Sequence, residues 1–575
     1  MNRAPSPLKD LLTSATWAAV LFGLLEGALH IVLRGYPALQ AAHKLGPAAL
    51  WITPLGNLLL LLPLAVGLAL VARVWAVAGT APAAWGIFGA LGAMAVFRAP
   101  EVLHPATVGL LGLGVGTMVS RAVRAQGAGF VPALRRWLPV LPVLLLLALA
   151  GTLLEQRLTE QRRVAALPAA PAGRPDVLIL ILDTVRRDRF TGAHSLTPTL
   201  DSLAAGGTDF ANAWAPSSWS LPSHASILTG RHATVHGANW PGLRLADSIP
   251  SVAEAFRDAG YATGAFSSNH AWVTPEYLGR GFTRFRVYEQ LDLWERTSAG
   301  RIGSRVLALF GWRPGQPVVP APRTIRRYLD FVDAHPGRPT FGYICFMDVN
   351  RAFYNQLHGK KAWEPKHSMA SAIAAYDAAL TRLDGELAQL LAELRRRGRL
   401  ANTVIVVSSD HGESFGPDDA PDHLPRGHGT SLYPEQVRVP FFVTGPGVPA
   451  GQIVPAATSL VDVPGLVLGL AGLPDARFAP GPALAAVRAP AEADTVGDVF
   501  TTLDYDKWSA RSAIEGTTQY IVTRAPAPGG EELFDLATDS TAQVSLPATD
   551  PRWGPLQDLL RRFDPTSPTP RAPSR

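Results

Sequence analysis

The stretch from Ser217 to Gly230 places one hydroxyl side chain where a nucleophile would stand. Within it, Ser220 precedes a Leu-Pro pair, a polar Ser-His pair and an apolar run that closes on Thr-Gly. This order predicts a helix that begins close to Ser220, and the free backbone N–H groups of such a first turn attract an anionic substrate. A capped helix after a turn has the same pattern, so the stretch alone leaves both interpretations open.

Two carboxylates and an imidazole follow two continuous apolar runs. The run Val177–Leu182 ends on Asp183, and the run Thr403–Ser409 ends on Asp410-His411. Such runs are typical of strands buried on both faces of a largely parallel sheet, where ligands bind at the carboxyl ends of the strands. With a deprotonated serine hydroxyl they form four ligands for a divalent metal, which would activate the serine and neutralise an ester oxyanion. Taken singly, each Asp could instead cap a helix, and Asp-His-Gly could form a turn.

Alternating strands and helices must position these residues. Further strands are predicted at Phe341–Met347, which ends on Asp348, at Val439–Thr444 and at Tyr520–Thr523. Apolar residues at three- and four-residue steps from Ile373 to Leu394 predict a helix whose leucines lie in the core, with Gly398 at its C-terminal end. The alternation predicts an α/β fold with a doubly wound sheet.

The charge of the chain is unevenly distributed. Residues 1–154 hold ten Lys and Arg against three Asp and Glu, whereas the remainder of the 575 residues holds 42 against 43. A nucleic-acid enzyme would carry the basic excess on its binding domain, so the charge distribution argues against this class. The single cysteine, Cys345, excludes an intramolecular disulfide framework and a cysteine-rich zinc site.

The basic first quarter carries about five stretches of the length and apolarity of membrane spans. We place them at Leu11–Leu33, Trp51–Ala72, Thr80–Phe97, His104–Val119 and Trp137–Leu154. A removed signal peptide would explain one such segment, not five. The sequence therefore predicts an all-α polytopic membrane domain ahead of the α/β domain.

The basic residues between the spans predict the orientation. With the N-terminus inside, the inside loops hold seven Lys and Arg and the outside loops three. Five spans then place the catalytic domain outside the cytoplasm, in a multi-pass protein of the cell membrane. Glu26 and His30 lie one turn apart in the first span, where a functional pair and a mutually bonded structural pair are both open.

We expect four segments along the chain. They are a transmembrane domain at 1–154, a polar linker at 155–174, a catalytic domain at 175–546 and an unstructured, Pro- and Arg-rich tail at 547–575.

From Asp176 to Leu546 the chain resembles the sulfatase family of the alkaline-phosphatase superfamily. The order of its landmarks carries the resemblance: V-L-I-L-I-L-D-T-V-R-R-D (177–188), S-S-W-S-L-P-S-H-A-S-I-L-T-G-R (217–231), H-G (236–237), F-M-D-V-N (346–350), S-S-D-H-G-E-S-F-G (408–416), G-H-G-T-S-L-Y-P-E-Q-V-R-V-P (427–440) and E-L-F-D-L-A-T-D (532–539). The resemblance implies Asp183, Asp410 and His411 as metal ligands, and Ser220 as a nucleophile that also contacts the metal. The cofactor is one divalent ion, Ca, Mg, Mn or Zn.

Three more residues are candidates for binding the ester anion. Arg231 follows Thr-Gly as a basic residue often does in the family, or it caps the helix. His270 occupies a region where many sulfatases bind substrate, and His428 lies one residue off the spacing of the family's second lysine. A satisfied surface histidine is the alternative for these two.

The chain departs from the family at three positions. His224 replaces the arginine of the formylglycine sequence, Thr184 replaces the second Asp of the usual pair, and Asn350 replaces a histidine. We keep His224 and Asn350 as substrate-binding candidates. These changes disfavour a formylglycine mechanism and suit an unmodified serine that forms a covalent phospho-enzyme. The S-x-P-S-H arrangement is similar to the T-x-P-N-H of nucleotide pyrophosphatases/phosphodiesterases, and the architecture is similar to lipoteichoic-acid synthases and phosphoethanolamine transferases.

The sequence therefore predicts a membrane-anchored, metal-dependent enzyme whose Ser220 attacks a sulfate or phosphate ester, with His428 as general acid. A phosphoester on a lipid or envelope glycan is favoured as substrate, with the membrane and no nucleic acid as partners. The alternatives are a formylglycine-dependent sulfatase and an inactive relative that serves as a binding domain.

Overall fold

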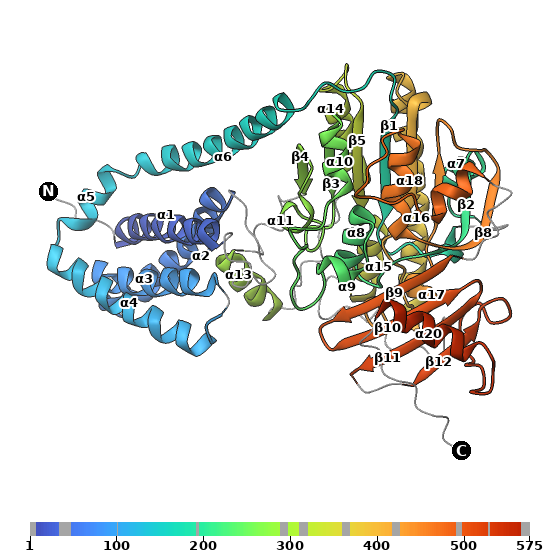
Figure 1. Ribbon diagram of the computed structural model, residues 1–575. Coiled ribbons are helices and arrows are strands. Elements are labelled where there is room, and N and C mark those ends of the chain that lie inside the picture. Colours follow the sequence, from blue (N-terminus) through green and yellow to red (C-terminus); the bar gives the residue numbers. More distant parts are fainter. Residues whose placement is uncertain are drawn as a thin grey trace. The chain divides into compact units, whose positions relative to one another are not determined.

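A computed structural model of the chain divides it into two compact units (Figure 1). It describes residues 7–33, 48–100, 102–190, 195–287, 297–309, 320–358, 368–416, 426–489, 497–526 and 530–564. The first unit, here the helical unit, comprises Met1–Arg162, Glu289–Pro317 and Lys360–Glu364. The second, here the sheet unit, comprises Arg163–Tyr288, Val318–Gly359 and Pro365–Arg575.

The helical unit contains the long apolar helices that the sequence predicts. They are α1 (Pro7–Leu33), α2 (Ala49–Val71), α3 (Ala81–Arg98), α4 (Pro105–Gln126) and α6 (Val140–Ala165). All five are long and apolar enough to cross a membrane, so their predicted number is confirmed. The short α5 (Phe130–Arg136) precedes α6.

The first half of the predicted polar linker is helical. Helix α6 continues to Ala165, because the Gln-, Glu-, Arg- and Leu-rich sequence after Leu154 has high helix propensity and lacks Gly and Pro. The Pro- and Ala-rich residues after Ala165 form no helix or strand up to β1, as expected for the end of the linker.

One helix of the helical unit comes from a later part of the chain. Helix α13 (Ser298–Leu309) contacts α2 and α3, and the predicted boundaries did not anticipate this. The Ser298 N–H donates to Glu26 Oε1 at 2.9 Å, and the Ser298 Oγ donates to the Ala95 carbonyl at 3.0 Å. His30 Nε2 lies 4.0 Å from the same Glu26 oxygen. The buried Glu26 therefore has a structural role at the start of α13.

The core of the sheet unit is an eight-stranded sheet of order β4-β3-β5-β1-β6-β7-β2-β8. Its strands are β1 (Asp176–Leu182), β2 (Thr208–Trp214), β3 (Ala262–Ser267), β4 (Arg284–Val287), β5 (Thr340–Phe346), β6 (Thr403–Ser408), β7 (Phe441–Thr444) and β8 (Gln452–Ser459). Strand β7 is antiparallel to both neighbours, and the other pairs are parallel. The four strands of this sheet that the sequence predicts are confirmed to within two residues at each end.

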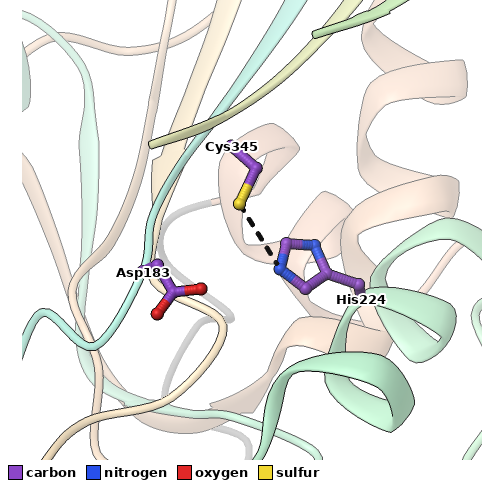
Figure 2. Close-up of side chains that lie close together, drawn as sticks. All are labelled: Asp183, His224 and Cys345. Atoms are coloured by element: carbon purple, nitrogen blue, oxygen red, sulfur yellow. Dashed lines mark hydrogen bonds between the residues drawn. The ribbon is translucent and has the colours of Figure 1, made fainter. Parts of the chain in front are cut away.

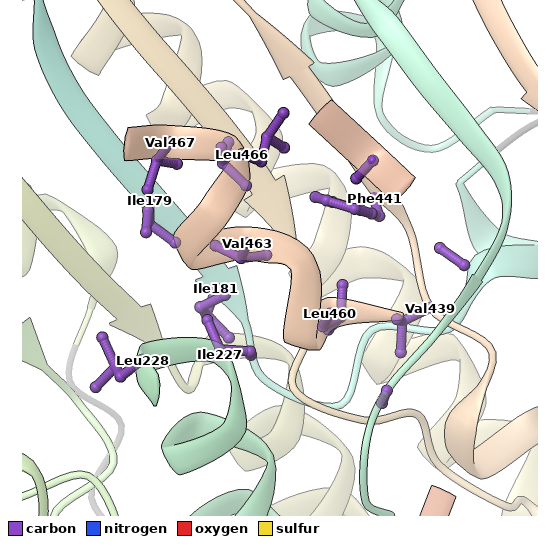
Figure 3. Packing of buried hydrophobic residues seen from close by; sticks show 14 of the residues in the cluster. Ile179, Ile181, Ile227, Leu228, Val439, Phe441, Leu460, Val463, Leu466 and Val467 are labelled. Atoms are coloured by element: carbon purple, nitrogen blue, oxygen red, sulfur yellow. The ribbon is translucent and has the colours of Figure 1, made fainter. Parts of the chain in front are cut away.

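Helices cover both faces of this sheet, as a doubly wound fold requires. Along β1, Val177, Ile179 and Ile181 face one apolar cluster, and Leu178, Leu180 and Leu182 face another. Figure 3 shows the first cluster, in which β1 packs against α8 (Ser220–Thr229) and α18 (Val463–Leu470).

The second cluster contains the predicted leucine-rich helix, α16 (Met369–Arg396), and α14 (Ala321–Asp333). Gly398, just beyond the end of α16, has a φ of +68°, as a helix C-terminal glycine should.

A second, antiparallel sheet follows, of order β12-β11-β10-β9. Its strands are β9 (Asp498–Tyr505), β10 (Trp508–Glu515), β11 (Thr518–Ala525) and β12 (Glu531–Asp535), of which only part of β11 was predicted. Helix α20 (Trp553–Phe563) packs on it through Leu556, Leu559 and Leu560. The predicted unstructured tail is therefore wrong for this segment, whose leucines at three- and one-residue steps form an apolar face. The rest of the tail, 565–575, lies outside the described residues.

Candidate active site

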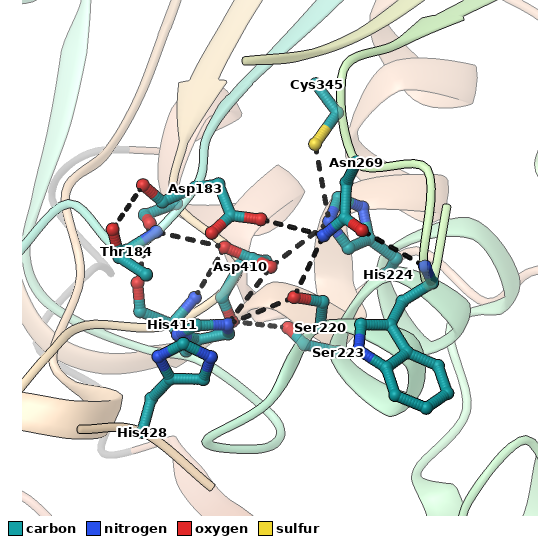
Figure 4. A network of polar contacts seen from close by, with 12 residues as sticks. Asp183, Thr184, Ser220, Ser223, His224, Asn269, Cys345, Asp410, His411 and His428 are labelled. Carbon is teal, nitrogen blue, oxygen red and sulfur yellow. Dashed lines mark hydrogen bonds and ion pairs between the residues drawn. The ribbon is translucent and has the colours of Figure 1, made fainter. Parts of the chain in front are cut away.

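The candidate site lies where three elements of the sheet unit end or begin (Figure 4). Strand β1 leads into Asp183, the adjacent β6 leads into Asp410 and His411, and α8 begins at Ser220 after β2. All four residues are buried. Neighbouring parallel strands bring their carboxyl ends to the same edge of a sheet, which explains why residues so distant in sequence meet here.

The donor set fits a divalent cation. A carboxylate oxygen of Asp183, a carboxylate oxygen of Asp410 and a ring nitrogen of His411 all lie within 4.8 Å of one another. Asp183 Oδ1 and Asp410 Oδ2 are buried carboxylate oxygens with no hydrogen-bond partner among the described residues. His411 Nδ1–H donates to the Gly412 carbonyl at 2.9 Å, which leaves the lone pair of Nε2 for a metal. Ser220 Oγ lies 3.2 Å from this Nε2.

The charges of the cluster also favour a cation. Burial, followed by the neighbouring Asp410 carboxylate, raises the pKa of Asp183. Burial opposes ionisation of Asp410 too, but the imidazoles of His411 and His224 outweigh it and lower the pKa of Asp410. Burial lowers the pKa of His411 to about 4, so its ring is neutral, the form that binds metals. Two close buried carboxylates are stable together only if positive charge balances them.

Asn269 connects the metal ligands with the nucleophile, and the sequence analysis missed it. Its Nδ2 donates to Asp183 Oδ2 at 3.0 Å and to Ser220 Oγ at 3.2 Å. The next residue, His270, is the predicted one, and it is only partly buried. Asn269 follows β3, whose sequence does not predict a strand and therefore gives no signal for a site residue at its end.

His224, which replaces the family's arginine, is fully buried beneath the ligands. Its Nε2 lies 3.2 Å from Asp410 Oδ2 and 3.8 Å from Cys345 Sγ, and its Nδ1 bonds the Tyr343 hydroxyl. Asp183, His224 and Cys345 form a second group of possible ligands (Figure 2). However, burial and the two carboxylates raise the pKa of the Cys345 thiol, so it lacks the thiolate that a metal prefers. In this structure His224 supports Asp410, and its predicted contact with substrate stays a prediction.

Thr184, which replaces the second Asp, contributes through its backbone. It has a φ of +66°, a strained value for a β-branched residue. Its hydroxyl donates to the Asp183 carbonyl at 2.6 Å, and its N–H donates to Asp410 Oδ1 at 3.4 Å. Tyr376 of α16 holds this turn, because its hydroxyl donates to the Thr184 carbonyl at 2.8 Å. The turn therefore positions the two carboxylates instead of adding a third.

His428 lies beside the metal ligands in a network that the sequence analysis did not foresee. Its ring centroid is 4.3 Å from that of His411, and its Nδ1 is 3.0 Å from Glu413 Oε2. The Tyr354 hydroxyl donates to the other Glu413 oxygen at 3.0 Å. Burial disfavours the charged form of His428, but the Glu413 carboxylate outweighs burial and raises its pKa. The arrangement suits a proton donor.

Two predicted substrate-binding residues make no described contact with the cluster. Arg231 is exposed, and its guanidinium donates to the carbonyls of Gly230 and Arg477. These contacts fit the alternative interpretation, in which Arg231 caps the end of the helix. Asn350 is buried in α15 (Asp348–His358), beside Arg351, whose charge acts on Asp183.

A sequence model of one family, described as Sulfatase, matches residues 175–473, just over half of the chain. The chain is 24% identical over 344 residues to an arylsulfatase of Clostridium perfringens, a match that covers 48% of this chain and 69% of that protein. It is 27% identical over 313 residues to arylsulfatase A of Homo sapiens, covering 49% and 60%. It is 24% identical over 325 residues to an ulvan-active sulfatase of Formosa agariphila, covering 52% and 62%. The matches thus span less than two thirds of the last two relatives.

Among solved structures, the phosphonate monoester hydrolase SpPMH of Silicibacter pomeroyi has the same fold. It superposes with a TM-score of 0.53 at 19% identity, covering 68% of this chain and 94% of that one. The family and the relatives support an ester hydrolase of the sulfatase type. With the fold and the arrangement at the strand ends, these matches establish that the chain belongs to the sulfatase family.

Proposed function

We propose that the chain is a membrane-anchored, metal-dependent enzyme whose Ser220 takes up a phosphoryl or sulfuryl group from an ester. One observation carries the proposal. Ser220 Oγ is buried at the start of α8, 3.2 Å from both His411 Nε2 and Asn269 Nδ2, in a cluster where the buried Asp183 Oδ1 has no hydrogen-bond partner among the described residues. A hydroxyl in such a setting is prepared for nucleophilic attack rather than for helix capping.

Asp183, Asp410, His411 and Ser220 would hold one divalent ion, Ca, Mg, Mn or Zn. When bound, such an ion lowers the pKa of the serine hydroxyl and neutralises charge on the ester oxygens. The protein itself fixes the geometry: Asn269 donates to both Ser220 and Asp183, while His224 and the Thr184 backbone hold Asp410. The first-turn N–H groups of α8 provide further positive potential for an anionic ester.

The reaction needs one bond formed and one broken at the phosphorus or sulfur atom. The Ser220 hydroxyl first loses its proton to solvent, since a bound metal would lower its pKa. Its Oγ then forms the new bond, and the bond to the alcohol oxygen breaks, leaving an alkoxide. His428 gives this oxygen a proton, and Glu413 stabilises the imidazolium beforehand. Water, or a hydroxyl of an acceptor, then attacks the covalent intermediate, gives its proton to the neutral His428 and restores Ser220.

We favour phosphorus over sulfur because of the departures from the family pattern, two of which, His224 and Thr184, contact the metal ligands. Where the formylglycine sequence has an arginine, His224 carries an imidazole and no guanidinium. This imidazole contacts Asp410, Tyr343 and Cys345. Thr184 supplies no second carboxylate. A formylglycine-dependent sulfatase and an inactive binding domain remain the competing functions.

The five apolar helices favour a substrate held at the membrane. We propose that the helical unit spans the membrane several times with its N-terminus inside, as the seven inside and three outside Lys and Arg residues indicate. The catalytic domain then lies outside the cytoplasm, and the ester belongs to a lipid or an envelope glycan.

Mass spectrometry of the purified full-length chain tests the proposal. Peptides that contain Ser220 are weighed before and after incubation with lipid and glycan phosphodiesters, with Ser220→Ala as the test variant. Ser202→Ala, at an exposed serine of α7 (Pro198–Ala205), is the matched control. An adduct on Ser220 that persists in the control and disappears in Ser220→Ala supports phosphoryl transfer.

Two other outcomes reject it. A loss of about two mass units, which conversion of serine to formylglycine produces, favours the sulfatase alternative. An unmodified serine with neither adduct nor bound metal favours the binding domain.

A further inference from the structure

The helical unit contains a cavity of about 410 Å³ where α3 ends, α4 begins and α13 packs alongside. Three of its lining residues are arginines: Arg98, Arg301 and Arg305. The other lining side chains are mainly apolar and include Met94, Val108 and Ile302. Guanidinium groups and apolar side chains therefore share one cavity at the end of two apolar helices.

All three arginines lie on helices of the helical unit. Arg98 is the last residue of α3, and Arg301 and Arg305 lie four residues apart on α13, so they share one helix face. The start of α13 is fixed by the two Ser298 bonds to Glu26 and Ala95, and Arg301 Nη2 donates to Ser298 Oγ at 3.3 Å. Helix α13 lies beside α2 and α3 in Figure 1.

The described lining of the cavity is basic, because it contains three arginines and no Asp or Glu. The Glu26 carboxylate, which lies outside this lining, interacts with Arg301. Gathering cations at the end of apolar helices is costly unless an anion joins them. Guanidinium groups bind phosphate in a bidentate way, and basic pockets between membrane helices recognise lipid head groups.

We infer that this cavity binds the phosphate of an anionic glycerophospholipid, with the start of an acyl chain against Met94, Val108 and Ile302. The apolar side chains favour a lipid over a free anion as the ligand, because a free anion would interact only with the arginines. The inference rests on the proposed membrane-spanning role of the helices and not on the chemistry of Ser220. In the proposed orientation, the connection between α3 and α4 faces the extracytoplasmic side.

Lipid binding to the full-length chain in detergent tests the inference. Phosphatidylglycerol, phosphatidylcholine and inorganic phosphate are titrated and followed by native mass spectrometry. The test variant is R98Q/R301Q/R305Q, and the matched control is R73Q/R121Q/R124Q, which removes three exposed arginines of the same unit. We expect phosphatidylglycerol to bind the chain more tightly than phosphatidylcholine. The test variant should lose affinity about fivefold per arginine, on the order of a hundredfold in all, and the control should lose little.

Three results would overturn the inference. They are equal affinity in the test and control variants, equal affinity for the two lipids, and displacement of phosphatidylglycerol by an equal concentration of inorganic phosphate. If the triple variant does not fold, the exposed Arg305 allows a single Arg305→Gln test with an expected loss of about fivefold. Arg305→Lys keeps the charge but not the bidentate contact, so its loss should be smaller than that of Arg305→Gln. Lipid binding is measured without turnover, so the two experiments are independent. A negative lipid titration does not affect the test of the Ser220 adduct, and absence of the adduct does not affect the lipid result.

Discussion

The pKa values of two neighbouring histidines at the site shift in opposite directions. His411 is neutral, since burial lowers its pKa and its single N–H is bound to the Gly412 carbonyl. His428, with its ring centroid 4.3 Å away, retains a second proton more readily because Glu413 raises its pKa. Environments that push two pKa values apart separate the roles of ligand and acid.

Substitution of His428 should therefore affect substrates according to their leaving groups. In His428→Gln we expect kcat/KM for an alkyl phosphodiester to fall by roughly 10²- to 10⁴-fold, the usual contribution of a general acid. A 4-nitrophenyl ester should be far less affected, because its leaving group departs without a proton. Steady-state kinetics with both substrates measures the difference. Equal losses would show that His428 binds the substrate instead of protonating it.

Asp462 should make the stability of the fold depend on pH. It ends a short 3₁₀ helix (Leu460–Asp462) beside α8, and burial raises its pKa from 3.8 to about 7. The folded state then binds more protons than the unfolded state between these values, so the free energy of unfolding falls as pH rises through this window. Asp462→Asn keeps an acceptor for the Ala483 N–H and removes the titration.

The measurement is the thermal midpoint of wild type and Asp462→Asn at about pH 5 and about pH 8. We expect the variant to gain stability relative to wild type at the higher pH. A difference between the two proteins that stays constant with pH would contradict the assignment.

The site residues that the sequence predicts follow strands with a clear apolar pattern, whereas the one it misses follows a strand without such a pattern. Asp183 and Asp410 follow continuous Val, Ile and Leu runs, which are recognisable without a structure. Asn269 follows β3, A-T-G-A-F-S, whose small residues give no strand pattern. Gly264 of β3 is required by packing, since a Cβ there would lie 2.8 Å from the Phe266 ring and 2.9 Å from the Phe331 ring. Phe331 belongs to α14, which is distant in sequence, so this part of the constraint leaves no local pattern.

At the scale of elements, the loop after β6 is held against the short helix α17 (Pro434–Val437). The N–H groups of Gly412 and Glu413 donate to the carbonyls of Gln436 and Glu435, each at 2.8 Å. A Cβ on Gly412 would lie 2.1 Å from the Glu435 carbonyl oxygen. The close approach sets the positions of both His411 and Glu413, one on each side of this glycine.

Gly412→Ala should therefore weaken metal binding without touching a ligand. Displacement of the loop by the new methyl group should lower metal affinity by about 10- to 100-fold, as expected when the support of a ligand is lost. Isothermal titration of the metal-free protein measures this. Gly385→Ala is the control, because a Cβ there meets nothing within 4 Å, and the change should leave affinity unchanged while favouring α16 by up to ~1 kcal/mol. Unchanged affinity in Gly412→Ala would show that the loop adapts.

The helix and the strands that were not predicted have local sequences that do not indicate their secondary structure. Helix α20 lies in a Pro-rich segment, but its one proline, Pro555, stands in the first turn, where no backbone N–H is needed. The strands β9, β10 and β12 carry Asp, Glu, Ser and Arg, and their pairing with one another makes them a sheet. In contrast, α16 repeats its leucines over several turns and was predicted almost to its ends.

At the scale of the whole molecule, the proposed function depends on which side of the membrane the catalytic domain occupies. The chain allows a direct measurement, because its single cysteine, Cys345, is fully buried and should not react with a maleimide. Three exposed valines mark the relevant places: Val74 between α2 and α3, Val102 between α3 and α4, and Val544 after β12, with exposed fractions of 94%, 59% and 73%. Each can be replaced by cysteine with little change in size.

We expect a membrane-impermeant maleimide to label Val102→Cys and Val544→Cys in intact cells and to leave Val74→Cys unlabelled. Val74 adjoins Arg73, one of the seven inside Lys and Arg residues, whereas Val102 and the catalytic domain follow an odd number of spans. Lysed cells should label all three variants, and wild type should stay unlabelled in both conditions. The reverse pattern would place the catalytic domain in the cytoplasm and remove extracytoplasmic glycans and lipids from its substrates. Labelling of Val74→Cys together with Val544→Cys would instead mean that an even number of the intervening helices crosses the membrane, so that one of α3, α4 and α6 does not.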